Sequence, residues 1–389
     1  MNSVVKVGII GIGNMGSAHF NCIYNSEIDG LKVTSVCDID IQKLKKVKES
    51  YTDIETFSNY KEFMLKSDTD AVIIAVPHPL HAEIAVAAFK AGKHVLLEKP
   101  IDIAVSKAEA LCREAKKSKK IFAIMFNQRT NGLFAEARRI VRSGELGELK
   151  RSVWIITNWY RTQNYYDSGA WRATWKGEGG GVLLNQCPHQ LDLWQWICGM
   201  PKKVLSKLHY GLWHDIEVED DVTTYVEYEN GATGVFITST GDAHGVNRFE
   251  IQMDKGRLIA ENEKLELLEY DMTEQEFSKT NTEPFATVGA KKIEVETDGE
   301  NPQHVGVLNA WGGAILRGEP LVAGGEEGIN GLTLSNAMHL SSWLDKEITL
   351  PFDEELYYNE LMKRVATSKR KTNVKEVVAD TSGSYSGAK

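Results

Sequence analysis

The sequence has few cysteines, and their spacing builds no cross-linked or metal-bound framework. Its 389 residues include five, none of them in a Cys-x-x-Cys pair or at a metal-ligand spacing: Cys22, Cys37, Cys112, Cys187 and Cys198. An odd number of scattered cysteines fits reduced thiols and argues against a disulfide scaffold. We therefore expect no structural metal, and the cytoplasm is the expected location.

The sequence also lacks a long apolar run and an excess of positive charge. No segment approaches the ~20 apolar residues that a membrane-spanning helix needs. The first residues, MNSVVKVGII, pass into a strand-like pattern without a signal-peptide cleavage region. A net charge of −9 and a pI near 5.7 argue against nucleic acid or an anionic membrane as partner. What remains is an ordinary globular composition, with a length that predicts two or three domains at about 150 residues each.

Short apolar runs alternate with amphipathic helical stretches from Val4 to about Phe126. This alternation indicates βαβ units and a parallel sheet. The strands are expected at residues 4–10, 31–37, 71–76, 94–97 and 121–126. We take residues 1–126 as a nucleotide-binding domain.

The pattern changes after Asn127. The sequence predicts a helix over 132–144 and a strand over 151–160, and Asn230-Gly231 lies between two strand-like runs as a hairpin signal. A further hairpin is expected at 249–261, and helices at 303–317 and 326–345. We therefore expect an α+β domain over 127–350 with a mostly antiparallel sheet. Residues 351–389 are a C-terminal extension, whose small, polar end SGSYSGAK we expect to be mobile.

The hexapeptide GIGNMG, from Gly11 to Gly16, lies directly after the first strand and opens a helix. Gly11 permits a tight turn, Gly13 lets the backbone approach a pyrophosphate, and Gly16 lets helix and strand pack closely. Asp38 ends the second strand 22 residues after Gly16, where a ribose-binding acid belongs. An acid there repels a 2′-phosphate, and Ile39 supplies no cation, so NAD is favoured over NADP. The alternative is a merely structural turn.

LLEKPI, residues 96–101, ends the fourth expected strand. Ligands of open parallel sheets bind at the carboxyl ends of the strands, so Lys99 should point toward the nicotinamide. The alternative is a surface lysine in a turn made by Pro100.

GGGVLLNQCPHQLDLW, residues 179–194, joins three glycines to a helix that begins near Pro188. His189 then lies in the first turn, where free N–H groups and the helix dipole disfavour a protonated imidazole. A neutral histidine there can act as a base, and the glycines would let the backbone pass close to substrate or cofactor. Alternatively, His189 caps the helix and packs against Trp194 or Trp196.

Three of these segments together resemble the Gfo/Idh/MocA family of NAD(P)-dependent oxidoreductases, which includes glucose–fructose oxidoreductase and inositol dehydrogenases. They are GIGNMG, AVPHPLHAEIAVAAFKAGKHVLLEKP (75–100) and GGGVLLNQCPHQLD (179–192), supported by FNQR (126–129) and Trp171-Arg172. The match spans most of residues 4–350. It implies an α/β fold in which a doubly wound Rossmann sheet precedes an α+β domain with a large, open, mostly antiparallel sheet. Open sheets of this family often form subunit contacts, so a homo-oligomer, dimer or tetramer, is expected.

The resemblance also implies roles for individual residues. Lys99 contacts both cofactor and substrate, and His189 is the catalytic acid/base. The residues expected to bind NAD are Gly11, Ile12, Gly13, Asn14, Met15, Gly16, Asp38, Val76, Pro77, His78, His81, Glu98, Lys99 and Gln128. Two positions depart from the common pattern: His78 stands where many members have Asn, and Asn185 where many have Asp. The change at 185 should lower the pKa of His189 and put more of the catalysis on Lys99.

Seven of the nine tryptophans lie between 154 and 213, and such rings suit the apolar faces of sugars. The alternative is a sheet core, since alternation puts Trp154, Ile156 and Tyr160 on one face. The expected substrate contacts are Tyr160, Trp171, Arg172, Asn185 and Asp192. Asp192 either binds a sugar hydroxyl or is a solvated helix acid.

The resulting hypothesis is an NAD-dependent dehydrogenase acting on a secondary hydroxyl of a sugar, glycoside or cyclitol, with oxidation at a pyranose C3 as one specific case. His189 takes the hydroxyl proton and Lys99 stabilises the alkoxide. Two alternatives stay open. One is a redox-neutral glycosidase that uses bound NAD⁺ in oxidation and elimination. The other is a catalytically silent NAD-binding sensor.

Overall fold

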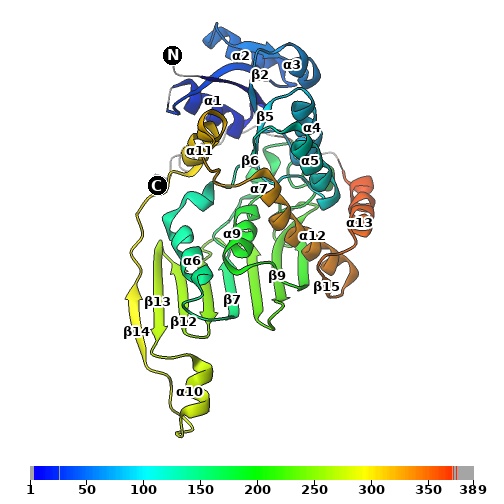
Figure 1. Ribbon diagram of the computed structural model, residues 1–389. Helices are drawn as coiled ribbons and strands as arrows, with labels where there is room; N and C mark the ends of the chain where they lie inside the picture. Colours follow the sequence, from blue (N-terminus) through cyan, green and yellow to red (C-terminus); the bar gives the residue numbers. More distant parts are fainter. Residues whose placement is uncertain (1–3, 26, 370, 372–373, 375–389) are drawn as a thin grey trace.

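The computed structural model describes residues 4–25, 27–369, 371 and 374. It contains two sheets, the smaller in the upper part of Figure 1 and the larger in the lower part. The SGSYSGAK end, expected to be mobile, lies outside the described residues.

Six parallel strands form the smaller sheet in the order β3-β2-β1-β4-β5-β6. Their bounds are β1 (Val5–Ile10), β2 (Leu31–Cys37), β3 (Glu55–Phe57), β4 (Ala71–Ile74), β5 (His94–Leu97) and β6 (Phe122–Ile124). The order reverses between β1 and β4, as at the ligand-binding switch point of a Rossmann fold. The predicted doubly wound sheet is confirmed. β3 was not predicted, because three residues at an edge carry too short an apolar signal.

Helices and short 3₁₀ turns connect these strands or follow the last of them. They are α1 (Asn14–Tyr24), α2 (Ile41–Ser50), α3 (Tyr60–Lys66), η1 (His78–Leu80), α4 (His81–Lys90), α5 (Val105–Ser118) and η2 (Asn127–Thr130). The strands read as nearly continuous apolar runs because both faces of the sheet are covered; β4 is buried at all four positions.

Nine strands form the larger sheet in the order β14-β13-β12-β11-β7-β10-β9-β8-β15. Their bounds are β7 (Leu149–Ile156), β8 (Lys203–Tyr210), β9 (Glu219–Glu227), β10 (Thr233–Ser239), β11 (Asn247–Met253), β12 (Gly256–Glu261), β13 (Lys264–Tyr270), β14 (Ala290–Glu294) and β15 (Ile348–Thr349). Both predicted hairpins are present, and Gly231 has the positive φ of 84° that its turn requires. Only β7 and β10 pair in parallel, so the expected, mostly antiparallel sheet is confirmed.

The strand predicted over 151–160 ends at Ile156. The pairing of both neighbouring strands stops there, at Thr238 and Asn247, so the chain leaves the sheet. Tyr160 is consequently 43% exposed and does not share the buried face of Trp154.

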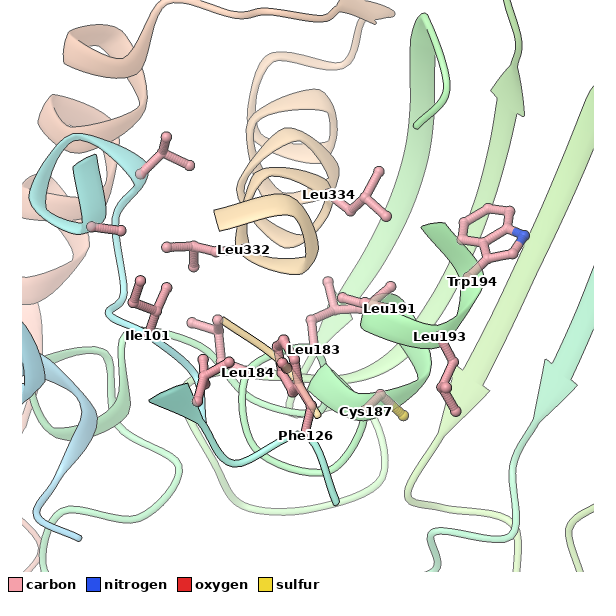
Figure 2. Close-up of a cluster of buried hydrophobic side chains, with 14 of the residues drawn as sticks. Ile101, Phe126, Leu183, Leu184, Cys187, Leu191, Leu193, Trp194, Leu332 and Leu334 are labelled. Carbon is pink, nitrogen blue, oxygen red and sulfur yellow. The ribbon is translucent and has the colours of Figure 1, made fainter. Parts of the chain in front are cut away.

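One face of the larger sheet carries the main core. The helices of this part are α6 (Gly132–Ser143), α7 (Gln163–Asp167), α8 (Trp175–Glu178), α9 (Pro188–Cys198), α10 (Glu274–Thr280), α12 (Gly328–Leu344) and α13 (Glu354–Thr367), with η3 (Gly325–Glu327). Figure 2 shows Leu183, Leu184 and Leu191 gathered with Leu332 of α12 in this core. Trp154 stacks on Phe249 at 4.2 Å between ring centroids.

The helix α11 (Gln303–Arg317) comes late in the chain but packs against the smaller sheet. Val307, Leu308 and Trp311 belong to the same buried cluster as Val7 and Ile9 of β1. In Figure 1 α11 lies beside α1. The first sheet is therefore completed by residues from the other end of the sequence.

Candidate active site

The glycine loop after β1 forms a cradle of main chain. Gly11 has a φ of +93°, and a Cβ there would meet the Ala75 carbonyl oxygen at 2.4 Å; a Cβ on Gly16 would meet the Gly11 oxygen at 1.8 Å. A Cβ on Gly13 would meet nothing within 4 Å. Gly11 and Gly16 are thus needed for the turn itself, while Gly13 faces the open side. The N-terminal turn of α1 carries no acidic residue and no side-chain cap, so its N–H groups suit the phosphates of a dinucleotide.

Asp38 lies at the end of β2, beside this loop. Its carboxylate accepts from the backbone N–H groups of Ile12 at 2.7 Å and Asp40 at 2.8 Å. Ile39 is 90% exposed and adds no positive charge. The remaining lone pairs of Asp38 fit the predicted ribose contact.

Lys99 follows β5 and reaches the glycine-rich segment far along the sequence. Its Nζ donates to the backbone oxygen of Asn185 at 3.0 Å. Burial lowers the pKa of Lys99, while the carboxylates of Glu98 and Glu178 raise it. The alternative of a surface lysine is therefore wrong: Lys99 is half-buried, and its hydrogen bond joins the two sequence motifs.

Glu98 is anchored on the opposite side, toward α1. Its Oε1 lies 2.8 Å from His19 Nε2, and this contact outweighs burial and lowers the pKa of Glu98 to about 2. Lys99 consequently has a permanent negative charge as its chain neighbour.

Gly179, Gly180 and Gly181 pack against protein rather than against a ligand. Added Cβ atoms would meet Ile103 at 2.6 Å, Leu184 at 2.9 Å and the Glu219 oxygen at 2.1 Å, respectively. The expectation that these glycines let the backbone approach substrate or cofactor is therefore wrong. They let the turn press into the core.

A buried carboxylate holds this turn through its backbone N–H groups. Glu219 accepts from the N–H groups of Gly181 at 2.8 Å and Leu183 at 3.0 Å, and pairs with His339 at 3.0 Å. Such contacts set the direction in which the chain enters α9.

His189 lies in the first turn of α9, directly after Pro188, as predicted. Burial, followed by the positive charge of Lys99, lowers the pKa of His189 well below its ordinary value. Its ring contacts Phe126 edge-on at 6.2 Å rather than Trp194 or Trp196. Among the described residues none forms a hydrogen bond with its Nδ1. A neutral, half-buried imidazole close to an ammonium is an arrangement that can accept a proton.

Asn185 connects Lys99 to a carboxyl group that the sequence analysis did not single out. Its side-chain amide donates to Glu178 Oε1, and Glu178 Oε2 accepts from the Ala173 N–H. Glu178 is 2% exposed, and burial raises its pKa to about 7. The sequence offered one signal for Glu178. It is an acidic residue directly before the three glycines, in a motif whose residue 185 is uncharged.

The two histidines of the loop after β4 differ in role. His78 contacts Trp171 edge-on at 6.0 Å and lies 3.3 Å from the Glu178 backbone oxygen, while Val76 and Pro77 are half-exposed. His81 is buried, with its ring nitrogens 2.6 Å and 2.8 Å from backbone oxygens. The structure thus gives His81 a role in positioning the loop, in place of the predicted direct cofactor contact.

The expected substrate contacts separate into two groups. Arg172 stacks on Tyr165 and Trp171, and its charge acts on Glu178 and Lys99, so it belongs to the cluster. Tyr160 is in an exposed loop, and its backbone oxygen accepts from Arg161 rather than from Arg172 or Lys99.

Gln186 was not predicted, and it lies within the same region. Its amide donates to Tyr165 Oη at 3.3 Å, while its buried Oε1 has no partner in the part of the chain that the structure describes. A buried acceptor without a partner is costly, so this oxygen is a candidate to accept from a bound molecule.

Asp192 is neither a solvated acid nor free to meet a sugar hydroxyl. It is 1% exposed, and its two oxygens accept from Arg129 Nη2 and Nε, both at 2.7 Å. Arg129 also pairs with Glu327. The structure therefore places Asp192 in a buried ion pair beneath the site.

Gln128 donates to Gln303 Oε1 of α11 at 3.1 Å. The side chain is half-exposed, so a bound cofactor could still reach it. Its cofactor contact stays a prediction.

Two family models match the chain. The oxidoreductase family with an NAD-binding Rossmann fold matches residues 5–126, and the GFO/IDH/MocA C-terminal domain matches residues 134–259. Together they cover more than half of the sequence.

The chain belongs to the Gfo/Idh/MocA family. It is accordingly an oxidoreductase with an NAD-binding Rossmann domain, as the motifs predicted. In the described ranges no helix is long and apolar enough to span a membrane.

Relatives of the same family cover most of the chain. Myo-inositol 2-dehydrogenase of Thermotoga maritima is 24% identical over 338 residues, which are 86% of this chain and 95% of that protein. Levoglucosan dehydrogenase of Pseudarthrobacter phenanthrenivorans is 25% identical, covering 68% of this chain and 75% of that protein. The WlbA dehydrogenase of Chromobacterium violaceum, solved with NADH and UDP-GlcNAcA, superposes with a TM-score of 0.75 at 25% identity, covering 91% and 97% of the two chains.

Proposed function

We propose that the protein is an NAD-dependent dehydrogenase of a secondary hydroxyl in a sugar, glycoside or cyclitol. In this proposal His189 is the acid/base and Lys99 stabilises the developing alkoxide. The observation that supports it best is the hydrogen bond from Lys99 Nζ to the backbone oxygen of Asn185, which lies in the turn four residues before His189.

The chemistry follows from the states of these two groups. NAD, when bound, supplies the nicotinamide that accepts a hydride from the alcohol carbon. His189 is neutral near pH 7, because its pKa lies well below the ordinary value, so its imidazole can take the hydroxyl proton. Lys99 presents an ammonium whose positive charge stabilises the oxygen as that proton leaves.

The residues around the glycine loop favour NAD over NADP in this proposal. Asp38 would accept from the ribose hydroxyls, and its charge would repel a 2′-phosphate. Ile39, exposed beside it, offers no cation to offset that repulsion.

The substrate class is inferred from the polar groups near Lys99 and from the relatives. Arg172, Asn185 and the unpaired Gln186 oxygen provide several donors and acceptors in a small volume, which suits a polyhydroxylated ring. Relatives named for inositol and levoglucosan act on such compounds.

A screen of sugars, glycosides and inositols for NADH formation tests this function. We expect NADH absorbance to increase with at least one of these compounds. Cleavage of a glycoside without NADH accumulation would identify the redox-neutral glycosidase instead. Binding of NAD with no turnover of any compound would leave the sensor.

Oligomerisation and location remain parts of the proposal. The uncovered face of the larger sheet carries partly exposed apolar side chains, including Leu205 at 40% and Tyr225 at 37%, which suits contact between subunits. We infer a dimer or tetramer, to be checked by light scattering. Five free thiols support the cytoplasm as location.

A further inference from the structure

Glu178 is a buried carboxyl group that the proposed reaction does not use. It ends α8, immediately before the three glycines, and is 2% exposed. Its two oxygens accept from the Asn185 side-chain amide and the Ala173 N–H. An ionisable group is costly to bury, and a glutamine would satisfy the same geometry less well, since an amide has only one acceptor oxygen.

Asn185 makes two contacts that run in opposite directions. Its backbone oxygen accepts from Lys99 Nζ at 3.0 Å, and its side chain donates to Glu178. One residue therefore bridges the ammonium and the carboxyl group. Asn185 itself is neutral, so in this chain of contacts the negative charge belongs to Glu178.

We propose that Glu178 is a positioning residue, which acts through Asn185 to keep the Lys99 ammonium charged and oriented toward the substrate hydroxyl. This inference rests on the proposed function only for its effect on turnover. The effect of Glu178 on the charge of Lys99 can be tested by itself.

Several charged or titratable groups face Glu178 from the surrounding elements. They are Arg172 from the loop before α8, Lys99 after β5, Glu219 of β9, Tyr166 of α7, Lys371 after α13 and, through the Glu178 backbone oxygen, His78 of η1. Arg172 favours the carboxylate and Glu219 opposes it. Burial is the largest effect and raises the pKa of Glu178 to about 7.

The two catalytic candidates and Glu178 should therefore titrate in separate pH ranges. His189 stays neutral well below its ordinary pKa, so loss of the base would affect turnover only in more acidic solution. Glu178 gains a proton as the pH falls through about 7 and then no longer offsets the charge of Lys99. A decline of kcat below about pH 7 would thus belong to Glu178.

The test compares Glu178→Gln with the double variant Glu178→Gln/Asn185→Asp. Glu178→Gln removes the charge at nearly constant shape. Asn185→Asp then returns a carboxylate to the residue whose backbone oxygen accepts from Lys99. We expect kcat of Glu178→Gln to fall about tenfold to a hundredfold, with loss of the limb near pH 7 and little change in NADH affinity. The double variant should recover much of kcat with a shifted pH profile. Asp102→Asn is the matched control, since Asp102 is equally buried with a pKa raised to about 6, but does not contact Asn185 or Lys99.

A second measurement does not depend on turnover. Only a neutral amine reacts with acetic anhydride, so the pH dependence of Lys99 acetylation, followed by mass spectrometry between about pH 6 and pH 10, reports its pKa. Glu178→Gln should move the Lys99 midpoint to lower pH, and the added Asn185→Asp should move it back. Asp102→Asn should leave it in place.

The outcomes separate the two proposals. A Lys99 midpoint and a pH profile that match wild type in Glu178→Gln would overturn the role of Glu178, even if the enzyme is active. A shifted midpoint in a protein that oxidises no sugar or polyol would support the role of Glu178 and count against the proposed function.

Discussion

The glycine loop and the Lys99–His189 cluster lie at the same end of the smaller sheet but are built by different means. At Gly11, Gly13 and Gly16 the backbone forms the binding surface, and what matters is the space that absent side chains leave. Around Lys99 the site is made of buried charges and amides from distant segments. The first region should respond to added volume, and the second to the loss of a charged or proton-accepting group.

The largest effect is expected in the second region. His189→Ala and Lys99→Ala should each lower kcat by about 10²- to 10⁴-fold, because acid–base transfer and alkoxide stabilisation are removed. NADH affinity of His189→Ala, measured by fluorescence titration, should stay close to wild type. His209→Ala, at an exposed histidine of β8, is the control. If both variants had the kcat of wild type, the catalytic roles of His189 and Lys99 would be wrong.

The buried ion pair of Arg129 and Asp192 should contribute to the free energy of unfolding. Asp192→Asn leaves Arg129 without its bidentate partner, so the free energy of unfolding should fall by about 3–5 kcal/mol. Asp68→Asn breaks the exposed pair with Lys6 and should cost at most about 1 kcal/mol. Urea denaturation of both variants measures the difference, and equal losses would contradict it.

Two small substitutions can distinguish the glycine that binds cofactor from the glycine that the turn requires. Gly13→Ala adds a methyl group to open space, so folding should be unaffected while the Kd for NADH rises about tenfold, or ~1.4 kcal/mol. Gly16→Ala would place its Cβ 1.8 Å from the Gly11 oxygen and should lower thermal stability instead. Thermal melts with and without NADH would separate the two. Unchanged affinity in Gly13→Ala would count against the pyrophosphate cradle.

The smallest expected effect is a pH dependence of stability. Burial lowers the pKa of His78 well below the 6.5 of an unfolded histidine, so the folded protein binds fewer protons than the unfolded chain below that pH. Stability should therefore fall as the pH drops below about 6.5, by up to ~1.4 kcal/mol per pH unit from this residue. His78→Gln should flatten the decline, whereas His209→Gln should not.

The acids with raised pKa values act in the opposite direction. Glu178 and Asp102 bind protons in the folded state at a pH where the unfolded chain has released them, which favours folding as the pH falls. The contribution of His78 is therefore read from the difference between variant and wild type at each pH. If the stability of His78→Gln and of wild type declined equally with falling pH, His78 would not be the source of the decline.

Much of the nucleotide side could be predicted from the sequence, because local patterns determine it. β2 and β5 lie where their apolar runs predicted, and Gly11 and Gly16 have the close contacts that their motif requires. Pro188 likewise placed His189 in the first turn of α9. The division of the chain at residue 126 stays a prediction.

The partners of buried polar groups could not be predicted, because they are far apart in sequence. Arg129 meets Asp192 across 63 positions, and Lys99 meets Asn185 across 86. The same reason explains the errors at Gly179–Gly181 and His81: each was assigned to a ligand, whereas tertiary packing places protein atoms there. A sequence pattern shows that glycine is required at a position, but not what approaches it.

The position of α11 bears on how the protein is made. Trp311 and its neighbours cover β1, yet they are synthesised long after the strand that they cover. While the ribosome translates the intervening residues, the nascent nucleotide-binding half has an apolar flank open to chaperones. That half can be completed only after residues 303–317 have been translated.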